Sequence, residues 1–231
     1  MLKKYLSLFC LLLPLGLAAQ DLMPQTLIID VPTANVFDKY QASLLTRAYA
    51  QGSVMESLDF GVLPQINIGL SIAVHELLGS SDDIKVLNPD FQAKWKVFDG
   101  NLYLPAIAIG YDGRRYGYIR PTKKYIDDRK GGFLTLTREV FMPGLEASAG
   151  VNMSDFDHDD IYFFLGVSAV VNEWLTVLGE WDNIHRMNQS RANVGARFMI
   201  TPSLALLGAV RRIGRGNENE RVLQVQYVTN F

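Results

Sequence analysis

The sequence predicts an all-β protein, a single antiparallel transmembrane β-barrel of about twelve strands. Three observations predict it: a final stretch of strict period-two alternation, a series of similar segments before it, and connections that alternate between short turns and long charged loops. A sheet that crosses hydrocarbon must close on itself, because every backbone N–H and C=O needs a partner within the protein. Segments of about ten residues, rising about 3.3 Å each and tilted near 40°, cross roughly 25 Å of apolar thickness.

The chain divides into three expected parts. Residues 1–20 have the parts of a secretory signal peptide: Lys3 and Lys4, then an apolar run, then small residues at the cleavage zone. The only cysteine, Cys10, lies in this signal, so the exported chain would have no disulfide and no thiolate metal site. Residues 21–40 are expected to be a periplasmic N-terminal segment or to lie in the barrel mouth, and the sequence does not decide whether they plug the lumen. Residues 41–231 would form the barrel.

The first five expected strands are separated by turn-forming residues. Alternation is clearest from Ile66 to His75, where aliphatic side chains alternate with small or polar ones. Lys94 and Lys96 share one face of the fourth segment, and Asp99-Gly-Asn101 after it is a strong hairpin turn. These strands are expected at 42–50, 54–63, 66–77, 91–97 and 102–111.

The remaining seven strands follow the same rule. In the last one Leu223, Val225 and Tyr227 form an apolar face, opposite a polar face with Gln224 and Gln226. These strands are expected at 132–141, 145–153, 161–171, 174–183, 192–200, 204–212 and 221–231.

Three segments, 42–50, 132–141 and 204–212, allow either phase of alternation. In one phase Arg138 would face lipid, which costs on the order of 2–4 kcal/mol at the bilayer midplane.

The connections sort by length in a regular way. Tight turns alternate with longer charged loops, as in outer-membrane barrels that have short periplasmic turns and long outer loops. A soluble β-sandwich gives no reason for this sorting. The tight turns are at 64–65, 99–101, 142–144, 172–173 and 201–203, and the loops at 79–90, 112–130, 154–160, 184–189 and 214–220.

Aromatic residues near the segment ends are expected to form girdles at the two membrane interfaces. The alternative, a soluble exported carbohydrate-binding β-sandwich, predicts aromatic residues toward the strand middles. The residues concerned are Tyr103, Tyr111, Phe133, Phe141, Trp174, Trp181 and Phe231.

The last strand also resembles the carboxy-terminal signal of bacterial outer-membrane β-barrels, with Tyr227 in the strand and a terminal Phe231. The resemblance implies that these two residues form an assembly signal, that the barrel assembly machinery and outer-membrane lipid are partners, and that the protein resides in the outer membrane.

A second resemblance is carried by Val31-Pro-Thr-Ala34, by the run Ala106-Ile-Ala-Ile-Gly-Tyr-Asp112 and by Tyr116-Gly117. These stretches are similar to the lead-in and a strand-to-loop junction of YjbH-type outer-membrane barrels. The resemblance implies an association with exopolysaccharide production or export, and it supplies no catalytic residues. The chain is much shorter than full-length YjbH-type proteins, so it would match a barrel portion.

Charged and polar side chains on the faces assigned to the lumen are the candidate functional residues. They could line a narrow polar passage that selects a solute, or they could pair and fill the interior. The set is Asp59, Lys94, Lys96, Glu146, Glu180, Asp182, Arg191, Arg197, Gln224 and Gln226.

An enzyme is not expected, although a membrane-embedded lipid hydrolase remains an alternative. Of the three histidines, His75 has Ser71 on its face, but about 13 Å away. His158 lies in an acidic loop that could bind a divalent cation and is more typical of a solvated loop, and His185 is expected at the surface. We expect no metal and no cofactor.

The longest loop is rich in basic residues and could meet an anionic polysaccharide, although Asp127 and Asp128 partly offset its charge. The formal net charge is −2, and −4 once Lys3 and Lys4 are removed, so no nucleic-acid partner is expected. The basic residues include Arg114, Arg115, Lys123, Lys124, Arg129 and Lys130. The expected role is therefore a non-enzymatic envelope protein, either a narrow pore for a small solute or a barrel serving surface-polysaccharide export.

Overall fold

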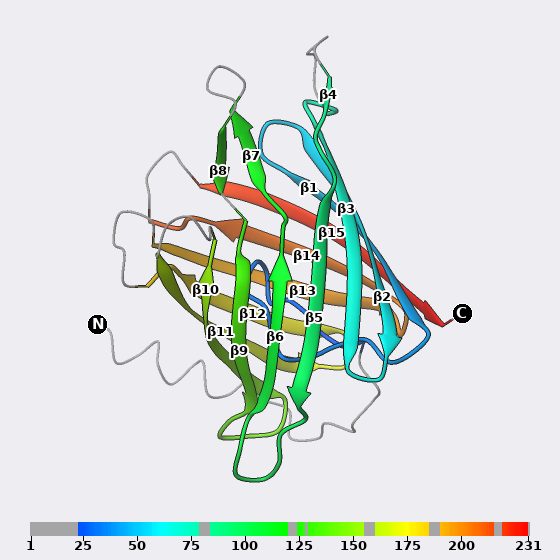
Figure 1. Cartoon of the computed structure of the whole chain (residues 1–231), viewed down its shortest axis with the longest axis vertical. Helices are drawn as coiled ribbons and strands as arrows, with labels where there is room; N and C mark the ends of the chain where they lie inside the picture. Colours follow the sequence, from blue (N-terminus) through cyan, green and yellow to red (C-terminus); the bar gives the residue numbers. More distant parts are fainter. Residues whose placement is uncertain are drawn as a thin grey trace.

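The chain folds into a closed antiparallel barrel of twelve strands, which confirms the expected fold class (Figure 1). This computed structural model describes residues 23–78, 84–119, 124–127, 129–154, 160–184, 190–214 and 219–230. The wall strands are β1 Gln41–Tyr49, β2 Ser53–Leu63, β3 Ile66–His75, β5 Asp90–Phe98, β6 Ala106–Asp112, β9 Gly131–Glu139, β10 Leu145–Met153, β11 Ile161–Asn172, β12 Leu175–Asp182, β13 Arg191–Thr201, β14 Leu204–Arg211 and β15 Glu220–Asn230.

The barrel closes where the first and last strands meet. β1 pairs with β15 from Gln41↔Asn230 to Ala48↔Leu223, so no strand edge is left open. This closure excludes two separately stacked sheets, the arrangement that the β-sandwich alternative required. Three further strands lie outside the wall: β4 Lys85–Val86 pairs with the end of β3, and β7 Tyr116–Ile119 pairs with β8 Lys124–Asp127 in the longest loop.

The two ends of the barrel differ in their connections. Five short connections follow β2, β5, β9, β11 and β13 at one end, which also holds the start of β1 and the end of β15; we call it the short-turn end. The long connections lie at the opposite end, the loop end, together with a short turn between β1 and β2.

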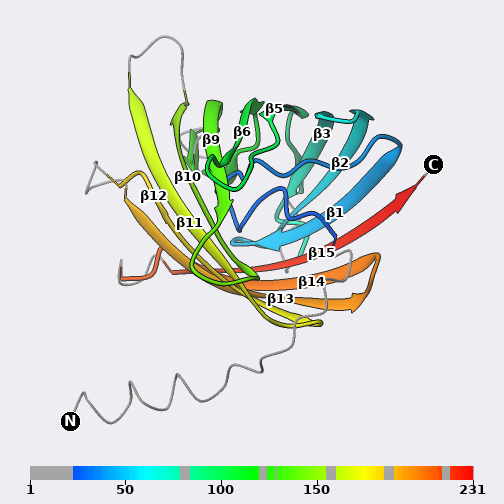
Figure 2. The same ribbon diagram turned by 90° about the horizontal axis from the view of Figure 1, so that it is seen from below.

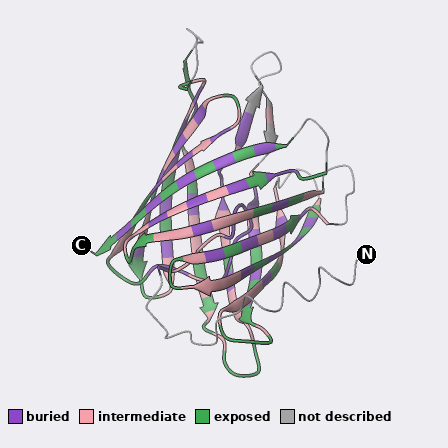
Figure 3. Ribbon diagram, turned by 180° about the vertical axis from the view of Figure 1, so that it is seen from behind, coloured by how far each residue is buried: buried purple, intermediate pink, exposed green. Residues whose placement is uncertain are grey.

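The outer face of the wall is apolar. Exposed and buried residues alternate along each strand, most regularly in β11 and β15 (Figure 3). Leu165 and Phe163 in β11 and Leu223 and Tyr227 in β15 are among many large hydrophobic side chains that point outward. A continuous apolar belt around a closed sheet is suited to lipid and not to water. Within the described residues, no helix is long and apolar enough to cross a membrane.

Two inward-pointing rings lie on glycines of the neighbouring strand. Phe133 is paired with Gly110, and Phe164 with Gly150; a Cβ added at either glycine would lie 2.5 Å from the opposite ring. The expectation that Phe133 belongs to an interfacial girdle is therefore wrong, because Gly110 leaves room for its ring inside the barrel. The other described girdle candidates are outward-facing or in turns.

The structure fixes the phase of the three ambiguous strands. Ser43 and Arg47 of β1, Thr135 of β9 and Arg211 of β14 face inward, so Arg138 faces outward. Arg138 lies next to the last residue of β9 and donates to the carbonyls of Leu102 and Tyr103. Its charge is thus held at the barrel rim and not at the bilayer midplane.

One expected strand begins later than predicted. Residues 102–105 precede β6 and belong to the turn after β5, because the Asn101 side chain accepts hydrogen bonds from the backbone N–H groups of Tyr103 and Leu104, each at 2.8 Å. A side-chain oxygen that satisfies two backbone donors competes with strand pairing.

The N-terminal segment lies within the barrel as a hairpin, which we define as residues 23–37 (Figure 2). A turn places the Ile28 N–H 2.9 Å from the Val31 carbonyl, and Leu27 pairs with Pro32. Met23 and Phe37 at the hairpin base pack with Ala205 and Val228 at the short-turn end. The hairpin therefore enters from the short-turn end and points its tip toward the loop end.

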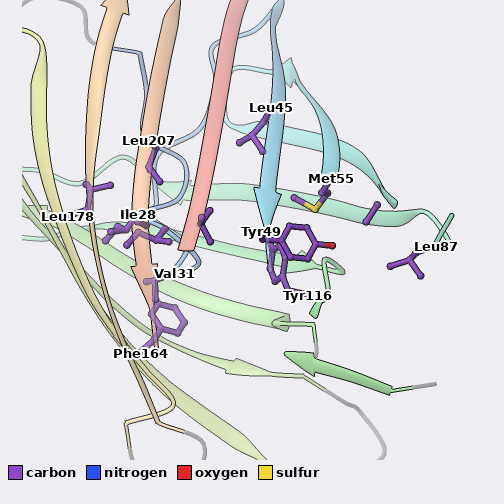
Figure 4. Close-up of a cluster of buried hydrophobic side chains, with 14 residues drawn as sticks. Ile28, Val31, Leu45, Tyr49, Met55, Leu87, Tyr116, Phe164, Leu178 and Leu207 are labelled. Atoms are coloured by element: carbon purple, nitrogen blue, oxygen red, sulfur yellow. The ribbon is translucent and has the colours of Figure 1, made fainter. Parts of the chain in front are cut away.

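The hairpin tip contributes to the main apolar cluster of the interior. Ile28 and Val31 pack against Phe164, Leu178 and Leu207 of the wall (Figure 4). The interior core thus depends on a segment that is not part of the wall.

A short connection joins the hairpin to β1. Tyr40, with a φ of 69°, donates to the Gly61 carbonyl at 2.9 Å, and Gln41 donates to the Asp38 carbonyl at 3.0 Å. A Cβ at Gly61 would lie 1.9 Å from the Asp38 oxygen, so a glycine is needed where the chain crosses β2.

The apolar belt makes a depth-dependent prediction. Leu165→Arg, in the middle of β11, should lower the free energy of unfolding by about 2–4 kcal/mol, because the charge would lie near the bilayer midplane. Ile161→Arg, outward-facing at the loop end of the same strand, should cost about 0–1 kcal/mol. Urea unfolding in phospholipid vesicles measures both, and equal costs would contradict the belt.

Candidate functional site

The inner face of the barrel wall carries many buried polar side chains, besides the apolar residues that pack against the hairpin tip. Almost every strand contributes buried hydroxyl, amide or charged side chains that point toward the hairpin. A wall of this composition is compatible with water and needs hydrogen-bonding partners wherever a segment covers it. The buried residues include Ser43, Arg47, Ser57, Asn67, Ser71, Gln92, Thr135, Thr137, Ser148, Asn152, Ser168, Glu180, Asp182, Asn193, Arg197, Arg211, Gln224 and Gln226.

Asp30 at the hairpin tip is held between two wall arginines, an arrangement we call the Asp30 clamp. Arg47 Nη2 donates to Asp30 Oδ1 at 2.7 Å, and Arg211 Nε donates to Asp30 Oδ2 at 2.6 Å. Burial raises the pKa of Asp30, but the Arg211 and Arg47 guanidinium groups outweigh this effect and hold that pKa below its usual range. The clamp therefore keeps its charges at neutral pH.

Glu180 of β12 binds the backbone of the same tip. Its carboxylate accepts hydrogen bonds from the N–H groups of Ile29 at 3.0 Å, Asp30 at 2.9 Å and Val31 at 3.0 Å. Asn193 Nδ2 donates to the other carboxylate oxygen at 2.5 Å. Three successive backbone donors that converge on one carboxylate form an anion-binding nest, so Glu180 fixes the tip.

Lys94 of β5 binds the stem of the hairpin. Its ammonium donates to three carbonyls of the N-terminal segment: Thr26 at 2.7 Å, Thr33 at 2.9 Å and Asn35 at 3.2 Å. An ammonium has three donors, and all three are used here.

The opposite side of the stem lies on β9 and β10. Thr135 donates to the Pro32 carbonyl at 2.9 Å, and Thr137 accepts from the Ala34 N–H at 2.7 Å. Glu146 accepts from the Asn35 side chain at 3.1 Å. Both sides of the hairpin are thus hydrogen-bonded to the wall.

The longest loop covers the tip from the loop end. The Tyr116 ring lies 4.4 Å from the Arg47 guanidinium and packs edge-on against Tyr49, with ring centroids 5.5 Å apart. Beside it, Arg114 pairs with Asp112 at 2.6 Å. The tip is therefore enclosed by the wall around it and by Tyr116 above it.

Further ion pairs surround the tip near the loop end. Asp182 binds both Lys130 and Arg191, the latter at 2.5 Å. Arg211 pairs with Glu220 at 2.5 Å in addition to Asp30. The predicted residues Asp182 and Arg191 are thus partners of each other.

Little space remains between the hairpin and the wall in the interior of the barrel. One cavity of about 50 Å³ lies between the hairpin and the wall, and a second of about 10 Å³ adjoins the Asp30 clamp. Such volumes hold one or a few water molecules, not a solute. In this state the hairpin fills the lumen.

A larger hollow of about 450 Å³ opens at the short-turn end. It is lined by Asn35, Thr137, Arg138, Glu139 and Glu146 and by the turn after β5. It lies beside the stem of the hairpin, on the side from which the hairpin enters.

The other predicted lumen residues do not hold the hairpin by hydrogen bonds. Asp59, Arg197, Gln224 and Gln226 line the 50 Å³ cavity, where Gln226 donates to Ser43 at 3.0 Å. Lys96 is paired with Asp99 at 3.1 Å, at the short-turn end. Of the predicted assembly signal, Tyr227 lies on the outer face, and Phe231 is outside the described residues.

The one described histidine has a hydroxyl neighbour on the next strand. His75 Nδ1 lies 3.0 Å from the Ser53 Oγ, and its Nε2 lies 3.5 Å from Glu76. Both His75 and Ser53 are buried, whereas a hydrolase would need its serine open to substrate. Ser71 accepts instead from Gln92 at 2.7 Å. His158 and His185 lie outside the described residues.

No group of three or more His, Cys, Asp or Glu side chains that could hold a metal ion occurs in the part of the chain that the structure describes. Most of the acidic loop 155–160 falls outside that part.

Several basic residues of the longest loop bind neighbouring residues of the barrel. Arg115 pairs with Asp90 at 2.8 Å, Arg129 donates to the Tyr111 hydroxyl at 3.0 Å, and Lys130 binds Asp182. These three charges hold the loop to the wall. Lys123 lies outside the described residues, as does the side chain of Lys124.

Sequence reasoning missed the central group of the site: Asp30, Arg47, Arg211 and Tyr116. Arg47 and Arg211 lie in strands whose phase could not be assigned from the sequence. A signal was present in Asp30, a single charged residue directly after the apolar run Leu27–Ile29, where a buried charge requires a partner.

One solved structure supports the fold. The structure is similar to the KdgM porin, with a TM-score of 0.51 and 12% sequence identity over 80% of this chain and 98% of that chain. A mutant porin of Rh. blastica gives a TM-score of 0.40 and 14% identity, and this chain spans 55% of its length. No family model and no curated protein match the sequence. The fold is that of a porin-like outer-membrane β-barrel, and these comparisons give no support to the YjbH-type resemblance.

The hydrogen bonds from the N–H groups of the hairpin tip to Glu180 lead to a testable prediction. Glu180→Gln should remove about 1.5–3 kcal/mol of stabilisation, because a neutral amide replaces the charged acceptor of three N–H groups. Amide hydrogen exchange at Ile29–Val31 should accelerate about 10- to 100-fold. Glu146→Gln is the matched control, since Glu146 binds only the Asn35 side chain of the stem. Unchanged tip exchange in Glu180→Gln would contradict this role.

Proposed function

We propose that the protein is a non-enzymatic channel of the outer membrane that the N-terminal hairpin holds closed. The observation that carries the proposal is the polar wall behind the hairpin. A barrel that is permanently filled is more stable with an apolar interior, since buried ion pairs contribute little net stability. A polar wall is instead required in a barrel whose lumen fills with water.

The way the hairpin is held also supports a removable plug. Its strongest attachments are the Asp30 clamp, the carboxylate of Glu180 and the ammonium of Lys94. Water can replace each of these contacts when the hairpin leaves. The tip also packs Ile28, Ile29 and Val31 into the apolar cluster of the interior, so its departure has to offset the loss of these hydrophobic contacts.

The solute is proposed to be small. Twelve strands enclose modest room even when the lumen is empty, which favours a small solute over a polymer chain. We therefore favour solute passage over the surface-polysaccharide export that the YjbH-type resemblance implies. The buried Ser53 and His75 give no support to lipid hydrolysis.

Removal of the hairpin tests the proposal directly. Deletion of residues 23–37 should raise the open probability in planar bilayers at least about tenfold over the full chain, because the plug is lost while the wall stays intact. Heat-modifiable migration on gels confirms that the variant barrel is folded. A folded variant that shows no conductance would overturn the channel.

A reversible disulfide bond between the hairpin and the wall gives a second test. Ala34→Cys with Thr137→Cys, in a chain whose Cys10 is replaced by serine, joins two positions already in contact, since the Ala34 N–H lies 2.7 Å from Thr137 Oγ1. The oxidised variant should show few or no openings, and dithiothreitol should restore them. Each single cysteine variant is the control. Openings that persist after complete oxidation would show that the hairpin is not the gate.

A further inference from the structure

The Asp30 clamp has the form of a carboxylate-binding site occupied by the protein's own side chain. Each oxygen of Asp30 takes one guanidinium, Arg47 at 2.7 Å and Arg211 at 2.6 Å. Both arginines belong to the wall, on β1 and β14, which flank β15. They therefore remain in place when the hairpin, and Asp30 with it, moves away.

Departure of the hairpin leaves Arg47 in an unfavourable state. Among the described residues, Asp30 is the one carboxylate paired with Arg47, whereas Arg211 also pairs with Glu220. Arg47 is 1% exposed, and its Nε has no hydrogen-bond partner even in the closed state. Water can hydrate Arg47 in the displaced state but does not supply the negative charge of Asp30, so the two guanidinium groups that faced Asp30 repel each other and favour an anion in the vacated position.

We infer that Arg47 and Arg211 form a binding site for a carboxylate-bearing solute, which replaces Asp30 and thereby favours the open channel. The inference rests on the proposed function, because it assumes that the hairpin leaves the lumen. A solute that binds only the displaced state raises the population of that state in proportion to 1 + [L]/Kd. Asp30 acts as the internal competitor of the solute.

The surroundings of the clamp limit which anions fit. Glu220 lies against Arg211, and Glu180 contacts the Asp30 backbone, so two wall carboxylates stand close to the site. They repel multiply charged anions such as phosphate more strongly than a single carboxylate. The Tyr116 hydroxyl, 3.3 Å from Arg47 Nη1, lies next to the site and offers a polar contact. The site thus favours a solute with one planar carboxylate.

The test compares salts of equal ionic strength in planar bilayers with the full chain. Sodium acetate should raise the open probability about fivefold over sodium chloride, as expected when its concentration is about four times its Kd. Sodium phosphate should have a smaller effect than acetate. A phosphate effect as large as that of acetate would overturn the assignment to carboxylates.

Variants identify the site. The Arg47→Gln variant should have a higher open probability in sodium chloride than the unchanged chain, because Asp30 has lost one of its two arginine partners. Sodium acetate should no longer change the open probability of this variant. Asp30→Asn should open in chloride about as often as the unchanged chain does in acetate. Arg197→Gln is the matched control: Arg197 is a buried arginine of the wall whose guanidinium donates to Gln226, and this variant should retain the acetate effect.

The outcomes separate this inference from the proposed function. If the variant lacking residues 23–37 is folded and silent, the channel itself is wrong. If that variant conducts but acetate and chloride act alike on the full chain, or acetate still acts on Arg47→Gln, the channel stands and the carboxylate site is wrong.

Discussion

The structure depends on one constraint: in a lipid environment the sheet has to pair all its backbone groups, so it must close into a barrel. Closure separates two surfaces that alternate residue by residue, and the inner one cannot be reached by lipid. In this chain the inner surface is polar and is covered by a hairpin from the same chain (Figure 2). The polar wall and the charged contacts of the hairpin follow from that separation.

The charged residues of the wall are arranged as a group to match the polar groups of the hairpin. Wall cations meet carbonyls and the carboxylate of the hairpin, while the wall carboxylate of Glu180 meets hairpin N–H groups. Three successive N–H groups of the tip thus bind a wall carboxylate, and the Ile29 carbonyl accepts from Arg47 of the wall. This complementarity allows a segment without a regular strand ladder of its own to be buried.

The fold could be predicted from the sequence because lipid imposes a period of two on nearly every strand. Turns with Pro, Gly and Asn set the boundaries to within a few residues, and β10 was predicted with its observed bounds. Where large apolar residues occupy adjacent positions, and therefore both faces, the alternation does not assign the phase; examples are Leu44 and Leu45 in β1, Phe133 and Leu134 in β9, and Leu206 and Leu207 in β14. The phase of those strands is set by pairing with their neighbours, and Arg47 and Arg211 were missed for that reason. The contacts of the hairpin could not be predicted either, since they join residues that are up to about 180 positions apart, such as Asp30 and Arg211.

The turn that joins the hairpin to β1 has a kinetic consequence. Asp38 to Tyr40 hold this connection against Gly61, so a hairpin that leaves the lumen stays attached a few residues from the mouth. A tethered segment acts at an effective concentration in the millimolar range whatever the amount of protein in the membrane. Reclosure is then a first-order event within one molecule, because the hairpin of each barrel stays at a fixed effective concentration near its own lumen.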